Sequence, residues 1–518
     1  MRHGDFCCPM RPFGSFRRPP RATLVPTAED AMTLAFDPLS LTLPAGHFID
    51  GAYVEDEARL EVRAPSSGRV IGHIPVADAA MVDRAVAAAR RALAVSGWAT
   101  LHPRDRLRAL HAWADLIEAE APALARLEAV CSSRPVAHVA AGDVPVTAEQ
   151  IRFFAEFADK EGGDLVPTGA GSLGFIAAEP YGVVGAIAPW NFPISMAGWK
   201  LAPALAAGNA VVLKPSEMTP WSTLYMAELS VRAGIPAGLV NVVLGDGPVT
   251  GAAITGHPGI DKVSFTGSTR AGAAIMENIA RTGIKPMTLE LGGKSPMLVF
   301  DDADIDLAAT CLERGILPNA GQFCVAGSRI IVQRGIADAL AARLADRFAR
   351  PRPAPTWAES PGFSPIISDP QLRRIDGIVQ AARAQGGEIL CGGTRFDHEG
   401  SFYRPTLIGG VSADNPAVTE EIFGPVATFQ TFDTEEEGLA LAQHPTYGLC
   451  AGLFTRDLSR ALRLTRRLEA GTVWVNRYGR SRDHILPTGG WKASGLGKDL
   501  GREAFAANRR TKSVLIDI

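Results

Sequence analysis

The stretch NAGQFCVAGSR, residues 319–329, places Cys324 among small, mostly uncharged residues with no histidine close by. A cysteine thiolate is a strong nucleophile, so Cys324 is a candidate for covalent catalysis on an electrophilic carbon. Free cysteine is also among the most buried residue types, and a single cysteine is more often a packing residue. A catalytic role therefore requires a base, a donor for the developing charge, and a fold that brings them together.

A second set of residues has the chemistry of a dinucleotide site. SFTGSTRAG (264–272) has the pattern of a strand, a Gly-Ser turn and a helix beginning near Ser268. A helix start offers unpaired N–H groups to an anion such as a pyrophosphate, although an ordinary capped helix has the same pattern. LKPSE (213–217) ends another strand with Lys214 and Glu217. A carboxylate there accepts from both ribose hydroxyls and repels a 2′-phosphate, which favours NAD over NADP.

Two other glycine-rich stretches fail as phosphate motifs. GDGPVTG (245–251) begins like a dinucleotide fingerprint, but Gly251 comes one position late for GxGxxG. GGKS (292–295) resembles the end of a P-loop, but the first glycine of that motif would be residue 288, which is Thr288. A nucleoside-triphosphate site is therefore excluded, and any dinucleotide is bound in an unusual way.

The elements around these residues predict an α/β fold. Apolar residues at helical spacing predict amphipathic helices over residues 81–99 and 104–130. Short β-branched runs closed by Gly, Pro or Ser, each followed by a helix-like segment, predict strands over 183–190, 210–216, 240–245 and 262–267. Near-continuous apolar strands alternating with helices indicate a doubly wound parallel sheet, whose ligands bind at the carboxyl ends of the strands.

The length of 518 residues exceeds what one hydrophobic core serves, so at least two domains are expected. We predict a disordered extension over 1–31, an NAD-binding domain over 32–157 and 181–291, and a catalytic α/β domain over 292–486. Strand-like runs at 171–180 and 511–518 lie outside these domains and need a partner edge, such as a neighbouring subunit. We therefore assign 158–180 and 487–518 to a small β oligomerisation arm and C-terminal segment.

The composition excludes several classes of protein. With 47% hydrophobic residues, 21% charged residues and a net charge of −3, the chain resembles a soluble globular protein and lacks the basic footprint of a nucleic-acid binder. Seven dispersed cysteines without a CxxC or Cys/His cluster argue against a disulfide framework and a metal site, and favour the cytoplasm.

The sequence carries no sign of a membrane protein. No apolar run reaches the length of a membrane span, and the first residues lack the apolar region of a signal peptide. The Arg- and Pro-rich opening faintly resembles a transit peptide but has no amphipathic period, and the true start is expected at Met32.

Six stretches together resemble one family. They are PWNFP (189–193), KPSE (214–217), FTGS (265–268), LELGGKSP (289–296), NAGQFC (319–324) and EEIFGPV (420–426). Their order and distances are similar to those of the non-phosphorylating, NAD(P)-dependent aldehyde dehydrogenase superfamily, over roughly Phe48 to Thr511. One such motif arises by chance, but six in register are very specific.

The resemblance implies a mechanism. Cys324 adds to the aldehyde carbon, and the Asn191 side chain and the Cys324 backbone N–H hold the oxyanion of the thiohemiacetal. After hydride transfer to the nicotinamide, Glu290 activates a water that hydrolyses the thioester to the carboxylic acid. Lys200 matches a proton-relay lysine, but its partner is Asp499, shorter than the usual Glu. The relay therefore stays open, beside the alternative of a helix-end ion pair of little worth.

The resemblance also implies the residues that bind the cofactor and the substrate. For NAD they are Pro189, Trp190, Lys214, Ser216, Glu217, Gly247, Phe265, Gly267, Ser268, Leu291, Glu421 and Phe423. For a small-molecule aldehyde they are Phe192, Trp199, Phe323, Val325, Arg480 and Arg482. The two arginines are either a carboxylate clamp, which would select a semialdehyde with an acidic tail, or a solvated rim.

The function expected from the sequence is NAD-dependent oxidation of an aldehyde to the acid by a homo-oligomer, a dimer or a tetramer. Three alternatives are weaker. Relatives that acylate coenzyme A typically lack the general-base glutamate, which this chain has at Glu290. A non-catalytic relative would have lost Cys324, Asn191 or Glu290. A Cys-His hydrolase is disfavoured because no motif ties a histidine to Cys324.

Overall fold

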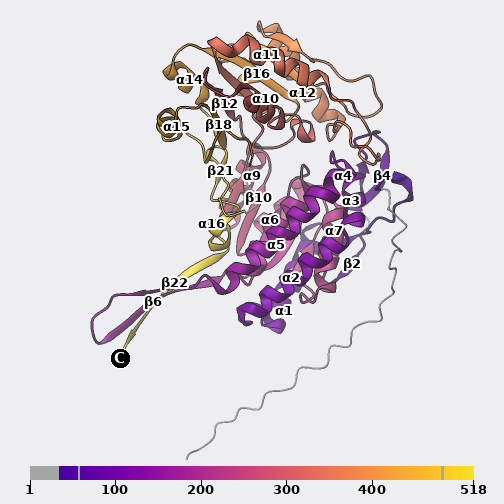
Figure 1. Ribbon diagram of the computed structural model, residues 1–518. Coiled ribbons are helices and arrows are strands. Elements are labelled where there is room, and N and C mark those ends of the chain that lie inside the picture. The colour runs from indigo at the N-terminus through magenta and orange to yellow at the C-terminus, as the bar shows by residue number, and fades with distance from the viewer. Residues whose placement is uncertain (1–33, 57–58, 480–483) are drawn as a thin grey trace, which may run out of the picture. The chain divides into compact units, whose positions relative to one another are not determined.

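The computed structural model describes residues 34–56, 59–479 and 484–518. In this part of the chain the first of two large sheets has eight strands in the order β2-β1-β9-β8-β7-β10-β11-β21 (Figure 1). Its parallel strands are β7 (Val183–Ile187), β8 (Ala210–Lys214), β9 (Val240–Val242), β10 (Lys262–Thr266) and β11 (Met287–Glu290). β1 (His47–Ile49), β2 (Ala52–Val54) and β21 (Gly495–Leu496) are antiparallel additions at its edges.

The second large sheet has seven strands within the described ranges, in the order β14-β15-β16-β13-β12-β18-β19. They are β12 (Pro296–Val299), β13 (Arg329–Gln333), β14 (Glu388–Cys391), β15 (Thr406–Gly409), β16 (Val426–Phe432), β18 (Cys450–Phe454) and β19 (Thr472–Val475). All pairings in it are parallel except that of β14 with β15. The predicted α/β fold with parallel sheets is confirmed. Along the chain, the change from the first sheet to the second falls between β11 and β12.

Helices cover both sheets and bury their central strands. Around the first sheet lie α1 (Ala79–Ser96), α2 (Pro103–Ala119), α3 (Ala121–Ala129), α5 (Val144–Glu156), α6 (Pro193–Ala206), α7 (Trp221–Arg232), α8 (Ala252–Gly256) and α9 (Thr269–Thr282). Around the second lie α10 (Ile305–Arg314), α11 (Arg334–Ala349), α12 (Asp369–Ala384), α14 (Glu435–Ala442) and α15 (Leu458–Thr465). Every residue of β7 and β8 is buried, as the apolar runs predicted.

One predicted element is wrong. The segment 104–130 forms two helices, α2 and α3, where the apolar pattern predicted one. Glu120 leaves the helical conformation between them (φ −97°, ψ 16°), and Pro122 lies in the first turn of α3. Proline has no N–H for a helix interior but fits a helix start, so the chain breaks immediately before it.

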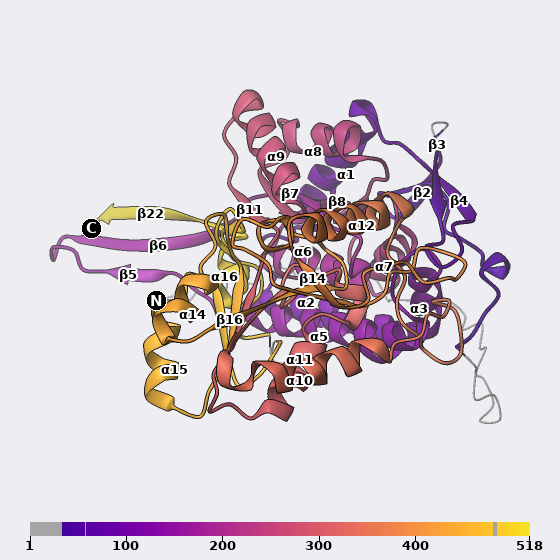
Figure 2. The ribbon, with the colours of Figure 1, turned by 90° about the horizontal axis from the view of Figure 1, so that it is seen from above.

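A third sheet contains the two strands that the sequence placed outside the large domains. β6 (Ser172–Pro180) pairs antiparallel with β22 (Arg509–Asp517) along its whole length, and β5 (Asp164–Val166) pairs with the other edge of β6. Figures 1 and 2 show these three strands projecting side by side from the rest of the described chain. Several apolar side chains on this sheet are exposed, among them Leu165 at 76% and Leu515 at 69%.

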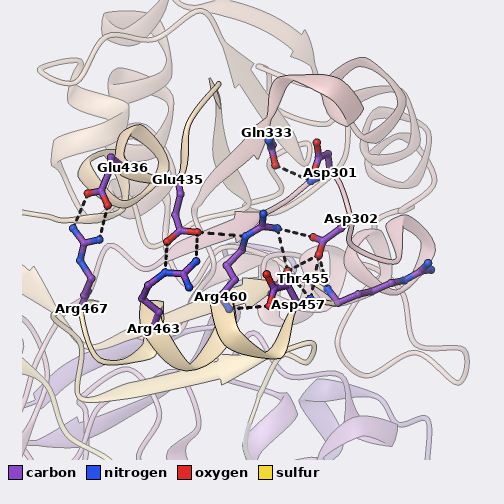
Figure 3. A network of polar contacts seen from close by, with 11 residues as sticks. Asp301, Asp302, Gln333, Glu435, Glu436, Thr455, Asp457, Arg460, Arg463 and Arg467 are labelled. Atoms are coloured by element: carbon purple, nitrogen blue, oxygen red, sulfur yellow. Dashed lines mark hydrogen bonds and ion pairs between the residues drawn. The ribbon is translucent and has the colours of Figure 1, made fainter.

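Ion pairs join α14 to α15 on the surface of the second sheet (Figure 3). Arg463 donates two hydrogen bonds of 2.8 Å to Glu435, and Arg467 donates two hydrogen bonds of 2.6 Å to Glu436. Arg460 is more buried and contacts Asp302 (3.1 Å) and Glu435 (3.4 Å). The network therefore ties two helices to the loop that follows β12.

Arg460 also stacks over an aromatic ring. Its guanidinium carbon lies 4.4 Å from the centre of the Phe300 ring, and its side chain is 23% exposed. Partial burial strengthens both the ion pairs and the cation–π contact, whereas the pair of Arg467 with Glu436 is largely solvated.

We predict that Arg460→Met lowers the free energy of unfolding by about 1–2 kcal/mol, because methionine keeps the packing but loses the charge contacts. The matched variant Arg467→Met should change it by less than about 0.5 kcal/mol. Urea denaturation of both variants measures the difference. Equal losses would show that burial of Arg460 adds nothing.

Candidate active site

A strained turn sets the position of Cys324. Asn319, Ala320 and Gly321 have φ values of 48°, 50° and 71°, the left-handed region. A Cβ at Gly321 would lie 2.1 Å from the Gly424 carbonyl oxygen, so only glycine fits there. Left-handed conformations in residues other than glycine concentrate at functional sites. Cys324 follows this turn and is partly exposed.

Buried amides hold the turn on both sides of the cysteine. The Gln322 side chain donates to the carbonyls of Asn319 (2.9 Å) and Pro365 (3.0 Å) and accepts from the Ile367 N–H (2.9 Å). After the cysteine, the Tyr478 hydroxyl donates to the Val325 carbonyl (2.9 Å). The NAGQFC motif was recognised in the sequence, but no role was predicted for Asn319 or Gln322. Two amide residues among small apolar ones were the available signal.

Asn191 reaches the same turn from the first sheet. It lies between β7 and α6, at the carboxyl end of a parallel strand, where ligands bind in this fold. Its side-chain amide donates to the Gln322 carbonyl (3.0 Å), and its own carbonyl accepts from the Asn319 side chain (2.9 Å). The predicted amide donor and the loop of the predicted nucleophile are therefore in direct contact.

Glu290 is the last residue of β11 and is 5% exposed. Its carboxylate lies against Gly489, where a Cβ would come 2.7 Å from Oε1. Three residues later, Gly293 packs so closely on the cysteine loop that a Cβ would lie 2.8 Å from the Cys324 carbonyl oxygen. The structure thus brings the segments that carry Glu290 and Cys324 together, and two glycines permit the approach.

Lys200 and Asp499 form an ion pair of 2.5 Å inside the protein. Their side chains are 0% and 6% exposed, so the two residues do form an ion pair, and it is buried. The shorter aspartate still reaches the lysine because its backbone pairs with Thr488 in both directions, which draws residue 499 inward. Lys262 lies in the same buried region, where burial lowers its pKa to about 8.

Glu128 anchors the start of α6, a role that sequence reasoning missed. It is fully buried and accepts from the Ile194 N–H (2.9 Å) and the Ser222 hydroxyl (2.8 Å). Burial raises its pKa to about 8, with a further contribution from nearby Asp143. Because Ile194 is three residues beyond Asn191, Glu128 helps to fix the direction of the loop that carries Asn191. A glutamate on the apolar face of a helix was the available signal.

The residues predicted for a dinucleotide gather at the carboxyl ends of the first sheet. Lys214 ends β8 and donates to the Glu217 carboxylate (3.3 Å), whose side chain is 39% exposed. Ser268 caps α9 through the Ala271 N–H (3.2 Å), and a Cβ at Gly267 would lie 2.4 Å from the Phe265 ring. The accessible carboxylate of Glu217 fits a ribose. The glycine turn and the start of the fourteen-residue helix α9 fit a pyrophosphate.

The other end of this site comes from the second sheet. Glu421 accepts from the Gly293 N–H (2.9 Å), and the Trp190 and Phe423 rings meet edge to face at 5.3 Å. Burial raises the pKa of Glu421 to about 7. Gln371 and Arg374 of α12 bond to the main-chain carbonyls of residues 421–423 and fix their path. The remaining predicted cofactor residues line the same strand ends or the following turns: Pro189, Ser216, Gly247 and Leu291.

The predicted substrate residues are in part described. Phe192 and Val325 are half-buried, and Trp199 and Phe323 are each 7% exposed. The guanidinium of Arg134 lies 4.6 Å from the centre of the Phe192 ring and is paired with Asp143 at 2.7 and 2.9 Å. Arg480 and Arg482 lie outside the described residues.

Within the described ranges, no group of three or more His, Cys, Asp or Glu side chains gathers in the manner of a metal site. In the same ranges no helix has the length and apolar character to cross a bilayer.

Comparison with known proteins identifies the family. A sequence model of the aldehyde dehydrogenase family matches residues 53–514. The chain is 42% identical over 473 residues to an aldehyde dehydrogenase of Aspergillus niger, covering 91% of this chain and 95% of that protein. The chain belongs to the aldehyde dehydrogenase family.

Solved structures of other aldehyde dehydrogenases share its architecture. An indole-3-acetaldehyde dehydrogenase of P. syringae, in complex with NAD+ and IAA, superposes with a TM-score of 0.91 at 36% identity, over 93% of this chain and 98% of that one. A gamma-glutamyl-gamma-aminobutyraldehyde dehydrogenase of Burkholderia cenocepacia superposes with a TM-score of 0.90 at 40% identity, over the same shares of 93% and 98%.

We predict that ionisation of Glu128 makes this aldehyde dehydrogenase less stable as the pH rises. The folded pKa of about 8 exceeds the unfolded value near 4.3, so the folded state binds the extra proton between these limits. The free energy of unfolding should fall between pH 5 and pH 8, and Glu128→Gln, which cannot ionise, should reduce that fall by at least about 1 kcal/mol.

Chemical denaturation at several pH values measures both profiles. The control is Glu156→Gln, an exposed glutamate of α5 that should leave the wild-type profile unchanged. Parallel profiles for wild type and Glu128→Gln would contradict the role of Glu128.

Proposed function

We propose that the described site oxidises an aldehyde to its carboxylic acid with Cys324 as nucleophile and Glu290 as general base. The contact between the loops of Asn191 and Cys324 supports this assignment most directly. The chain is an NAD-dependent aldehyde dehydrogenase. NAD supplies one chemical step when bound, the acceptance of a hydride from the substrate carbon.

The protein's own residues perform the remaining steps. The Cys324 thiolate adds to the aldehyde carbon, and the Asn191 amide and the Cys324 N–H stabilise the oxyanion. Loss of hydride leaves a thioester on Cys324. Glu290 then takes a proton from a water that attacks the thioester carbon, which releases the acid and restores the thiolate. The buried Lys200–Asp499 pair, 2.5 Å apart, supports a role in passing that proton onward.

The cofactor site favours NAD over NADP. Glu217 remains accessible at the end of β8, where its carboxylate would accept from ribose hydroxyls and repel a 2′-phosphate. Glu421 would bind the nicotinamide ribose, with Trp190 and Phe423 beside the ring. Ser268 and Gly267 would hold the pyrophosphate at the start of α9.

The predicted substrate residues favour an aldehyde whose side chain is apolar or aromatic. Phe192, Trp199, Phe323 and Val325 supply aromatic and aliphatic surface, and the relative from P. syringae acts on indole-3-acetaldehyde. A second candidate is a semialdehyde with an acidic tail. It rests on Arg480 and Arg482 in the sequence, because the charge of Arg134 is already balanced by Asp143.

We also propose that the protein forms a dimer or a tetramer through the sheet of β5, β6 and β22. Its exposed apolar side chains and unpaired strand edge support this proposal. We further propose a reducing compartment such as the cytoplasm, which the seven dispersed cysteines without a CxxC or Cys/His cluster support.

Replacing the nucleophile tests the mechanism. Cys324→Ala should lower aldehyde oxidation by at least about a thousandfold, because no other group can form the thioester. NAD should still bind, as measured by calorimetry, since the thiol does not hold the cofactor. Cys391→Ala, at a half-buried position in β14, is the matched control and should keep full activity. Turnover at the wild-type rate by Cys324→Ala would overturn the assignment.

A panel of substrates tests specificity. NADH formation would be followed at saturating NAD with an aliphatic aldehyde, an aromatic aldehyde and succinic semialdehyde. The apolar substrate residues predict a higher kcat/KM for the uncharged aldehydes than for succinic semialdehyde. Arg480→Met and Arg482→Met should then leave the order unchanged. A preference for succinic semialdehyde that either variant removes would instead establish the second candidate.

A further inference from the structure

A small cavity lies beside the second sheet. Its volume is about 10 Å³, which is space for a single guest of roughly the size of a water molecule or a halide ion. Lys294 from the segment before β12 and Arg329 at the start of β13 line it, with His444 and residues 448–451 around them. Glu469 lies at its rim.

Two buried cations meet at this cavity without a carboxylate partner. Arg329 is 1% exposed, and its hydrogen bonds to described residues go to main-chain carbonyls, those of Lys294 (2.8 Å), Leu441 (2.7 Å), Ala442 (2.7 Å) and Gln443 (3.4 Å). Lys294 is 2% exposed, and in the part of the chain that the structure describes its amine has no hydrogen-bond partner. A buried cation without a partner is strongly destabilising.

The acidic groups nearby are engaged elsewhere. Glu469 pairs with Lys492 (2.5 Å), which also donates to the His444 carbonyl (2.7 Å). The Glu421 carboxylate accepts from the Gly293 N–H and does not bond to the neighbouring Lys294 amine. His444 adds no charge, because burial lowers its pKa to about 4. The part of the chain that the structure describes therefore supplies no carboxylate that bonds to the Lys294 amine or to the Arg329 guanidinium.

We propose that this cavity binds one small monovalent anion, a halide such as chloride, with the Lys294 amine as its donor and Arg329 as a second positive charge. A water molecule would satisfy the amine's hydrogen bonds but would leave the charge of Arg329, and that of Lys294 whenever its amine is protonated, uncompensated. The anion supplies the negative charge that no neighbouring described carboxylate places in contact with Lys294 or Arg329. Burial lowers the pKa of Lys294 to about 7, and a bound anion favours its protonated form.

The location connects the anion to the active site. Lys294 directly follows Gly293, whose N–H holds Glu421 and whose backbone touches the Cys324 loop. An anion that fixes the Lys294 side chain would also fix this glycine segment.

Bromide tests occupancy directly, because its anomalous scattering distinguishes it from water. Crystals of the full chain grown in sodium bromide should show an anomalous peak in the cavity, within hydrogen-bond distance of the Lys294 amine. Water density without an anomalous peak would overturn the proposal.

Solution stability provides the second arm. In 100 mM sodium chloride the wild-type Tm should exceed that in 100 mM sodium gluconate, whose anion is too large for the cavity, by roughly 2–4 °C. Lys294→Met should lose this difference. Lys285→Met is the matched control, because its buried amine bonds to the carbonyls of Thr255 and His257, and it should keep the difference.

Equal wild-type Tm values in the two salts would overturn the proposal, even beside a bromide peak, which would then reflect binding at crystal concentration only. Failure of Lys294→Met to fold leaves the comparison of salts and the bromide peak as complete tests on the wild-type protein.

Discussion

The active site depends on one close backbone contact, that of Gly293 with Cys324. Any side chain at residue 293 would collide with the Cys324 carbonyl, because a Cβ would lie 2.8 Å from its oxygen. This approach brings the end of β11, which carries Glu290, close to the loop of Cys324. β11 is part of the first sheet, whereas the loop of Cys324 leads into β13 of the second sheet. The same glycine donates its N–H to Glu421 (2.9 Å), so one short segment touches both the loop of the proposed nucleophile and a carboxylate proposed for the cofactor.

Buried charge is the second theme of the molecule, and each instance carries a specific compensation. Lys200 has Asp499 at 2.5 Å, and Glu128 has two hydrogen-bond donors and a pKa that burial raises to about 8, which favours its neutral form. Glu421 has the Gly293 N–H. Glu128 and Glu421 bond to Ile194 and Gly293, which lie close in sequence to Asn191 and Glu290. Lys294 differs from these groups, because its amine has no hydrogen-bond partner among the described residues, and this is what points to an external anion.

Much of the fold could be predicted from the sequence because apolar strand runs and Gly or Pro turns are local signals. β7, β8 and β10 formed where those runs predicted them, with ends shortened by one to three residues. The break between α2 and α3 was missed because the apolar period continues across Glu120, and the proline that causes the break also fits a helix start. The roles of Gln322 and Glu128 could not be predicted because each depends on partners far away in sequence, such as Ile367 and Ser222.

The central claim is that Cys324 carries an acyl group that Glu290 removes. Mass spectrometry of intact Glu290→Gln protein, incubated with NAD and an oxidisable aldehyde, tests it directly. The account predicts an added mass equal to the acyl group, mapped to the peptide of Cys324 and released slowly, because glutamine cannot activate the water. Glutamine keeps the size of the buried side chain, so the fold should persist. Full turnover without an acyl adduct, or an adduct on another cysteine, would contradict the mechanism.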